Sequence, residues 1–171
     1  MRSAAPLFPS CTVVRLEVHM YPQLCFAPDI LHVRAWPDEV LDKLGFDPRS
    51  EYVEDYWLGI LGPSTVWLLR RLAAGFEYSP PGFDLDLAET ARSLGLGDRS
   101  GRHSPFVRAI NRTVQFGLAR LTGPEELSVR RRLPSLNRGQ VNRLSPAQQA
   151  RHAAWQEEQL RALSAEQAMA H

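Results

Sequence analysis

The residues best able to do chemistry in this chain are arginines, and they are concentrated in one segment. Residues 92–151 carry twelve arginines and three acidic residues, a net charge of +9. Residues 1–91 have a net charge of −6 and residues 152–171 one of −2, so the whole chain is close to neutral at +1. Guanidinium groups bind phosphate and carboxylate oxygens through paired N–H donors. A basic segment within a near-neutral chain therefore indicates a polyanionic partner, with nucleic acid as the first candidate.

The clustering of these arginines matters more than their identity. The chain has nineteen arginines and a single lysine, Lys43. Such a ratio is typical of a GC-rich genome and carries little functional information. A codon bias would spread arginines evenly along the chain, so their concentration in one segment needs another explanation.

Other chemistries find little support in the sequence. The spacing of Cys11, His19, Cys25 and His32 matches no common zinc motif. A phosphate-binding glycine loop, a nucleophile elbow and a paired-histidine metal motif are all missing. We therefore expect no metal, no cofactor and no enzymatic activity.

Length and composition predict a single domain with appendages. The chain has 171 residues, 44% of them hydrophobic, which is enough for one core. No stretch approaches the roughly 18 apolar residues of a membrane span. Pro6 and Pro9 interrupt the only stretch that could serve as a signal peptide. We therefore expect a cytoplasmic protein.

The N-terminal half is predicted to hold a loose arm followed by three helices. Prolines at positions 6, 9, 22 and 28 interrupt residues 1–35, which we expect to form a poorly packed arm. Capping residues and apolar spacing then predict helices over 37–44, 48–61 and 64–76. The third has the clearest apolar stripe and should be the core helix.

The basic segment itself is predicted to contain two helices. A short helix over 86–94 has capping-box spacing between Asp86 and Glu89. After a basic loop at 97–103, Ser104 and Pro105 open a second helix that runs to about Gly117. Apolar residues on one side of this helix should be buried. Its polar residues repeat at spacings of three and four and share one face: Arg108, Asn111, Arg112 and Gln115.

A β-hairpin is predicted to follow. Residues 118–122 and 127–133 have strand character and flank the turn at 123–126. Alternation places Ser128, Arg130 and Arg132 on the outer face of the second strand. Pro134 ends the hairpin, residues 135–144 form a polar connector, and a last helix starts at Ser145-Pro146.

This order of elements, from about Ser64 to Pro134, resembles a winged-helix DNA-binding domain. The resemblance is carried by the pattern Leu-Ala-x-x-Ala-x-x-Leu-Gly at 87–95, by the Ser-led helix ending in Phe-Gly-Leu at 104–118, and by the hairpin. It implies a mainly α fold with a small β-hairpin, a winged helix-turn-helix with additional N- and C-terminal helices. The arm would then span 1–35, the winged-helix domain 36–134, and the connector with the C-terminal helix 135–171. The loop at 97–103 is longer than the tight turn of simple helix-turn-helix proteins.

The whole chain also resembles an uncharacterised actinobacterial family, a resemblance that implies no activity. A bacterial winged helix would most simply be a sequence-specific double-stranded DNA-binding protein that regulates transcription. Its recognition helix would enter the major groove and the hairpin would follow the minor groove or the backbone. The expected DNA contacts are Arg99, Arg102, His103, Ser104, Arg108, Asn111, Arg112, Gln115, Arg130 and Arg132.

Three alternatives stay open. The arginine stripe could be an ordinary solvated face, and Arg130 to Arg132 could blunt an edge strand. The chain could be a protein–protein adaptor, or a homodimer through its N-terminal helices, that uses the acidic and aromatic segment Asp47–Trp67. It could also be a DNA-binding factor associated with plasmid or chromosome replication.

Overall fold

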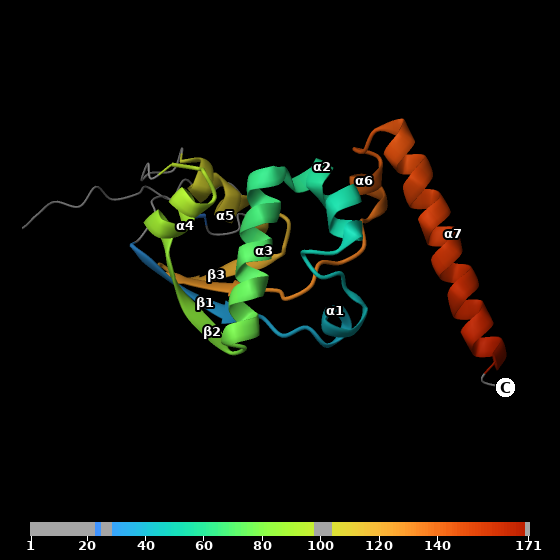
Figure 1. The fold of residues 1–171 in the computed structure, drawn as a ribbon, viewed down its shortest axis with the longest axis horizontal. Helices are drawn as coiled ribbons and strands as arrows, with labels where there is room; N and C mark the ends of the chain where they lie inside the picture. The colour runs from blue at the N-terminus through green and yellow to red at the C-terminus, as the bar shows by residue number, and fades with distance from the viewer. Residues whose placement is uncertain (1–22, 25–28, 98–103, 170–171) are drawn as a thin grey trace, which may run out of the picture.

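A four-stranded sheet joins the basic segment to the acidic part of the chain before it. The computed structural model describes residues 23–24, 29–97 and 104–169 (Figure 1). The strands are β1 (Ile30–Ala35), β2 (Gly82–Asp86), β3 (Ala119–Gly123) and β4 (Glu126–Val129). The helices are α1 (Glu39–Leu44), the π-helical η1 (Val53–Trp57), α2 (Leu58–Leu61), α3 (Pro63–Tyr78), α4 (Leu87–Ser93), α5 (Pro105–Gln115), α6 (Arg138–Val141) and α7 (Pro146–Met169).

The strand order is β2-β1-β4-β3, so the first strand in the chain lies inside the sheet. β1 pairs antiparallel with β2 and parallel with β4, and β3 pairs antiparallel with β4. The hairpin predicted at 118–133 is present, but it joins a larger mixed sheet instead of standing alone. The fold is therefore mixed α/β, with more helix than strand.

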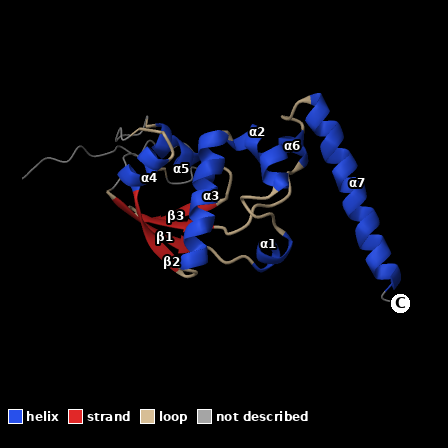
Figure 2. Ribbon diagram, in the orientation of Figure 1, coloured by secondary structure: helices blue, strands red, loops and turns tan. Residues whose placement is uncertain are grey.

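The two faces of the sheet differ in polarity. Leu31, Val33, Leu127 and Val129 are buried on one face, against which α3, α4 and α5 pack (Figure 2). His32 and Arg34 lie between these residues in β1 and remain about half exposed. This alternation is what a strand with one buried face requires.

The expectation of a poorly packed arm over residues 1–35 is wrong for residues 30–35. Leu31 and Val33 are fully buried, and both edges of β1 carry main-chain pairing. Leu24 is also buried. The nearby prolines misled the prediction: Pro28 precedes the strand, where it removes no donor from the ladder. Residues 1–22 and 25–28 of the predicted arm lie outside the described residues.

Most helix boundaries follow the capping signals in the sequence. Asp38 caps α1 by accepting from the amides of Val40 and Leu41, and Asp86 caps α4 by accepting from Glu89. The helix predicted over 48–61 is helical from residue 51 to 61, with a π-helical turn at η1 that the sequence did not indicate. α3 extends the predicted helix at 64–76 by one residue before it and two after it.

The C-terminal helix α7 is attached to the body through its first half. Figure 1 shows it running away from the rest of the chain. His152 and Trp155 pack against an aromatic cluster that also includes Phe46, Tyr52 and Tyr56. Leu136 and Leu144 of the segment before α7 are buried as well. The connector thus contributes to the core although its polar composition suggested otherwise.

A buried hydrogen-bond chain fixes this junction. The Tyr52 hydroxyl accepts from the amide of Leu136 at 2.9 Å and lies 3.0 Å from Nε2 of His152. The Nδ1 atom of His152 is buried without a partner among the described residues.

None of the helices in the described ranges is long and apolar enough to cross a bilayer.

The place of β1 can be tested with two neighbouring substitutions. Leu31→Ala should lower the free energy of unfolding by about 2–5 kcal/mol, because it leaves a cavity in the core. Ile30→Ala, at a position 39% exposed, should cost at most about 1 kcal/mol. Urea unfolding followed by circular dichroism measures both. Equal losses for the two variants would contradict a buried β1.

The α7 junction should weaken in acid. Burial lowers the pKa of His152 below its ordinary value. The unfolded chain therefore takes up a proton at a higher pH than the folded chain, so stability is full above about pH 6.5 and falls as the pH drops below it. The Tm of wild type should decline between about pH 6.5 and pH 5, and that of His152→Leu should decline less. Parallel curves for the two proteins would show that His152 does not contribute.

Candidate nucleic-acid interface

The helix α5 carries the polar stripe that the sequence predicts, and its start is firmly fixed. Ser104 caps it by accepting from the amide of Phe106 at 3.3 Å, and Pro105 occupies the first turn. The apolar residues Val107, Ile110 and Val114 are buried as expected. The stripe on the other side is narrower than expected, because its four polar residues differ in their contacts.

Two members of the stripe are free. Arg108 and Gln115 are exposed, and within the described residues neither makes a hydrogen bond or an ion pair. They are seven positions apart in the sequence, so they lie two turns apart on the same side of the helix, at about 10 Å along its axis. They form an exposed ridge that is available to a partner.

Asn111 is held by a distant segment. Its Oδ1 accepts from the amide of Leu24 at 2.8 Å, and its Nδ2 donates to the carbonyl of Leu24 at 3.0 Å. These bonds use the same amide edge that would recognise adenine. Asn111 therefore fixes residues 23–24 to α5, a use that the sequence prediction missed.

Arg112 is also engaged inside the protein. Its Nη2 donates to the carbonyl of Ile60 at 2.7 Å, near the end of α2, and its guanidinium lies 5.7 Å from the ring of Phe116. Its Nε is buried without a partner among the described residues. A cation at a helix C-terminus is electrostatically favourable. This contact ties α5 to α2 and turns the side chain away from the exposed ridge.

The hairpin arginines do not stand on an outer strand face. β4 ends at Val129 and lies between β1 and β3, and Ser128 is buried. Arg130 donates from Nε to the carbonyl of Gly117 at 3.0 Å. The predicted outer strand face is therefore wrong, because a strand paired on both edges cannot project as an isolated hairpin would.

Arg130 also belongs to a cluster that no local signal revealed. Its guanidinium lies 4.0 Å from the ring of Trp36, with that of Arg120 at 4.4 Å from the same ring. It forms an ion pair with Asp38. The amide of Leu41 and then the Arg130 guanidinium hold the pKa of Asp38 below its ordinary value.

The two arginines that follow donate to backbone carbonyls. Arg131 reaches the carbonyl of Pro80 at 2.7 Å, and Arg132 reaches that of Gly45 at 3.0 Å, at the end of α1. Both are exposed overall, but each has a structural bond. Arg99, Arg102 and His103 lie outside the described residues, so their predicted phosphate contacts stay predictions.

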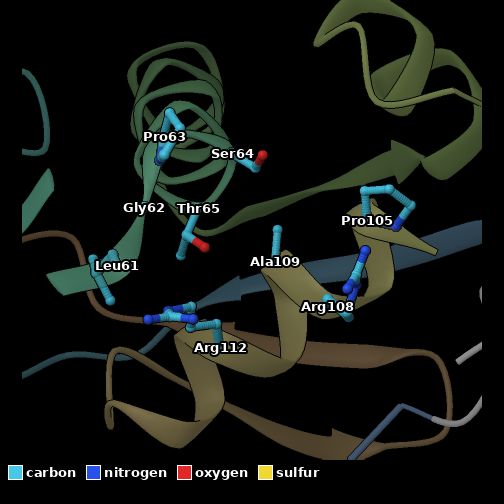
Figure 3. A pocket seen from close by; sticks show the side chains of 9 residues that line it. All are labelled: Leu61, Gly62, Pro63, Ser64, Thr65, Pro105, Arg108, Ala109 and Arg112. Carbon is cyan, nitrogen blue, oxygen red and sulfur yellow. The ribbon is translucent and has the colours of Figure 1, made fainter. Parts of the chain in front are cut away.

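A cavity of about 230 Å³ opens beside α5, at the start of α3. Figure 3 shows Arg108 and Arg112 on one side of it and Ser64 and Thr65 on the other. None of the described residues that line this cavity is acidic. The sequence prediction grouped the two arginines on one face but gave no sign that α3 would meet them.

Comparison with known proteins gives no match: no protein-family model, no curated protein and no solved structure is significantly similar to this chain. The function must therefore be inferred from the residues and their geometry.

Two arginines one turn apart on α5 should differ sharply in their effect on stability. Arg112→Ala should lower the free energy of unfolding by about 1–3 kcal/mol, because the carbonyl of Ile60 loses its charged donor. Arg108→Ala should change it by no more than about 0.5 kcal/mol, since the side chain is exposed and unbonded. Chemical denaturation measures both values. Equal stability of the two variants would show that the Arg112 contact contributes nothing.

Proposed function

We propose that this chain binds double-stranded DNA through the exposed ridge of α5, as a variant of the winged-helix domain, and that it acts as a transcriptional regulator. The observation that carries the proposal is the pair Arg108 and Gln115. They are exposed, unpaired within the described residues and aligned on one helix. A major groove admits one helix, and arginine and glutamine are the side chains that pair with guanine and adenine edges.

The order of elements supports the same proposal. α3, β2, α4, α5, β3 and β4 follow one another in the order of the segment that resembles a winged helix. In that arrangement α5 is the recognition helix. The sheet is larger than the resemblance implies, because β1 is inserted between β2 and β4. The proposal therefore places the DNA on the α5 side and does not use β4 as a wing.

The proposed contact set is smaller than the sequence suggested. Arg108 and Gln115 would read bases. Arg120 on β3 is exposed and makes no ion pair within the described residues, so it would bind a phosphate. Arg99 and Arg102 are retained as phosphate contacts on sequence grounds alone. We assign structural roles to Asn111 and Arg130, because a base contact would require breaking their internal hydrogen bonds.

Much of the aromatic surface that the adaptor alternative requires is buried. Tyr52, Tyr56 and Trp57 of the acidic and aromatic segment are buried in the core. Trp67 remains 57% exposed and Tyr78 91% exposed, both on α3. A protein partner would have to bind there, and its affinity would lack the steep salt dependence of phosphate contacts.

DNA binding should depend on the exposed ridge formed by Arg108 and Gln115. Sequences enriched from a random duplex pool should bind Arg108→Ala more weakly by about 1–3 kcal/mol, because a bidentate base contact is lost. Gln115→Ala should relax the preference at one base position. Fluorescence anisotropy at several salt concentrations measures both effects.

The matched control is Arg161→Ala, which removes the same charge from the free half of α7, where the side chain is 80% exposed. It should bind like wild type. Wild-type affinity should fall with salt at about −0.9 log units per phosphate contact. Equal weakening by Arg108→Ala and Arg161→Ala would overturn the ridge as the reading surface. If the protein binds no duplex even at low salt, the DNA-binding proposal is overturned and the adaptor alternative is favoured.

A further inference from the structure

The cavity between α3 and α5 has the features of an anion site. Arg108 and Arg112 line it, and within the described residues neither guanidinium is paired with a carboxylate. Two guanidinium groups one helical turn apart repel each other, and a bound anion would relieve this repulsion. Among the described residues, none that lines the cavity is acidic.

The start of α3 adds uncommitted donors. Its cap position is Gly62, which has no side chain to bind the first amides, and Pro63 has no N–H to offer. The amides of Ser64 and Thr65 donate to no acceptor among the described residues. These N–H groups and the helix dipole of a sixteen-residue helix favour negative charge at this end.

Thr65 provides a second, independent indication. The residue is only 2% exposed, yet its hydroxyl has no hydrogen-bond partner within the described part of the chain. Figure 3 shows this hydroxyl pointing across the cavity toward Ala109 of α5. The Thr65 hydroxyl therefore faces the cavity and can donate to an acceptor that enters it. The Nε of Arg112 is buried without a partner among the described residues, and such a group requires an explanation.

The size and geometry of the cavity select the ligand class. A volume of about 230 Å³ is several times the share of a single water in the liquid, about 30 Å³. Amides at a helix N-terminus, a hydroxyl and guanidinium groups together are the donors that bind tetrahedral oxyanions. Arg112 is already fixed by its bond to Ile60, so its charge is held at the wall before any ligand arrives.

We propose that this cavity binds a phosphate group. The amides of Ser64 and Thr65 and the Thr65 hydroxyl donate to its oxygens, Arg108 covers it from the solvent side, and Arg112 supplies fixed positive charge. The phosphate belongs either to a small phosphorylated molecule or to a nucleic-acid backbone. The site does not depend on the proposed base reading by Gln115.

The test is a titration of the ¹⁵N-labelled chain with inorganic phosphate at constant ionic strength, with chloride as the compensating anion. The amide signals of Ser64 and Thr65 should shift and saturate. Thr65→Val keeps the shape of the side chain and removes the hydroxyl. It should lower the affinity for phosphate about tenfold, because one hydrogen bond to a charged group is lost. Arg108→Gln should lower the affinity by a similar factor for the same reason.

Arg71→Gln is the matched control, because it removes an exposed arginine from the same helix as Thr65. It should bind phosphate like wild type. Unshifted Ser64 and Thr65 amides, or equal affinity in Thr65→Val and wild type, would overturn the site. Circular dichroism shows whether each variant is folded.

A second arm distinguishes the sources of the phosphate. If the occupant is a backbone phosphate, Thr65→Val also binds duplex DNA more weakly, and inorganic phosphate competes with the duplex. If it is a small molecule, a nucleoside monophosphate used as the probe shifts the same amides, and duplex affinity is unchanged in Thr65→Val. Either result supports the site. The DNA proposal is tested separately by Gln115→Ala, because Gln115 does not line the cavity.

Discussion

The pairing of β1 between β2 and β4 is the interaction on which the rest of the structure depends. β1 and β4 are parallel, so the segments that leave them run in the same direction from the same edge of the sheet. The amide of Trp36 bonds to the carbonyl of Val129 at 2.8 Å, which extends the register by one residue. Trp36 and Asp38 then lie beside Arg130, and a +9 segment is tied to the acidic first third of the chain.

This pairing divides the basic residues into two groups. Arg130 to Arg132 all follow β4, and each donates to a backbone carbonyl in an earlier part of the chain. Arg112 does the same at the end of α2. A guanidinium has five donors and suits such carbonyl contacts at helix ends and loops. Much of the positive charge therefore stabilises the fold, while Arg108 on α5 and Arg120 on β3 stay exposed without an ion pair among the described residues.

Local signals predicted the helices well, because a cap or an apolar stripe is written in adjacent residues. Asp86 and Ser104 were placed correctly as N-caps. The helix that Asp38 caps was predicted to start at residue 37, two residues before its observed start. The sheet and the arginine contacts could not be read in this way. The Arg130–Asp38 pair spans 92 residues, and the Asn111–Leu24 bonds span 87. Charge and helical periodicity identify which residues share a face, but only the folded chain determines which of them are already bonded.

In the proposed complex the ridge of α5, and not the arginines bound at the sheet, meets nucleic acid. The most direct measurement is the Nε–Hε spectrum of the arginine side chains during titration with a short random duplex. We expect the Arg108 signal to shift with added DNA while the Arg130 signal, held by Gly117 and Asp38, stays in place. A shift of Arg130 as large as that of Arg108, or no change at Arg108, would show that the ridge is not the contact surface.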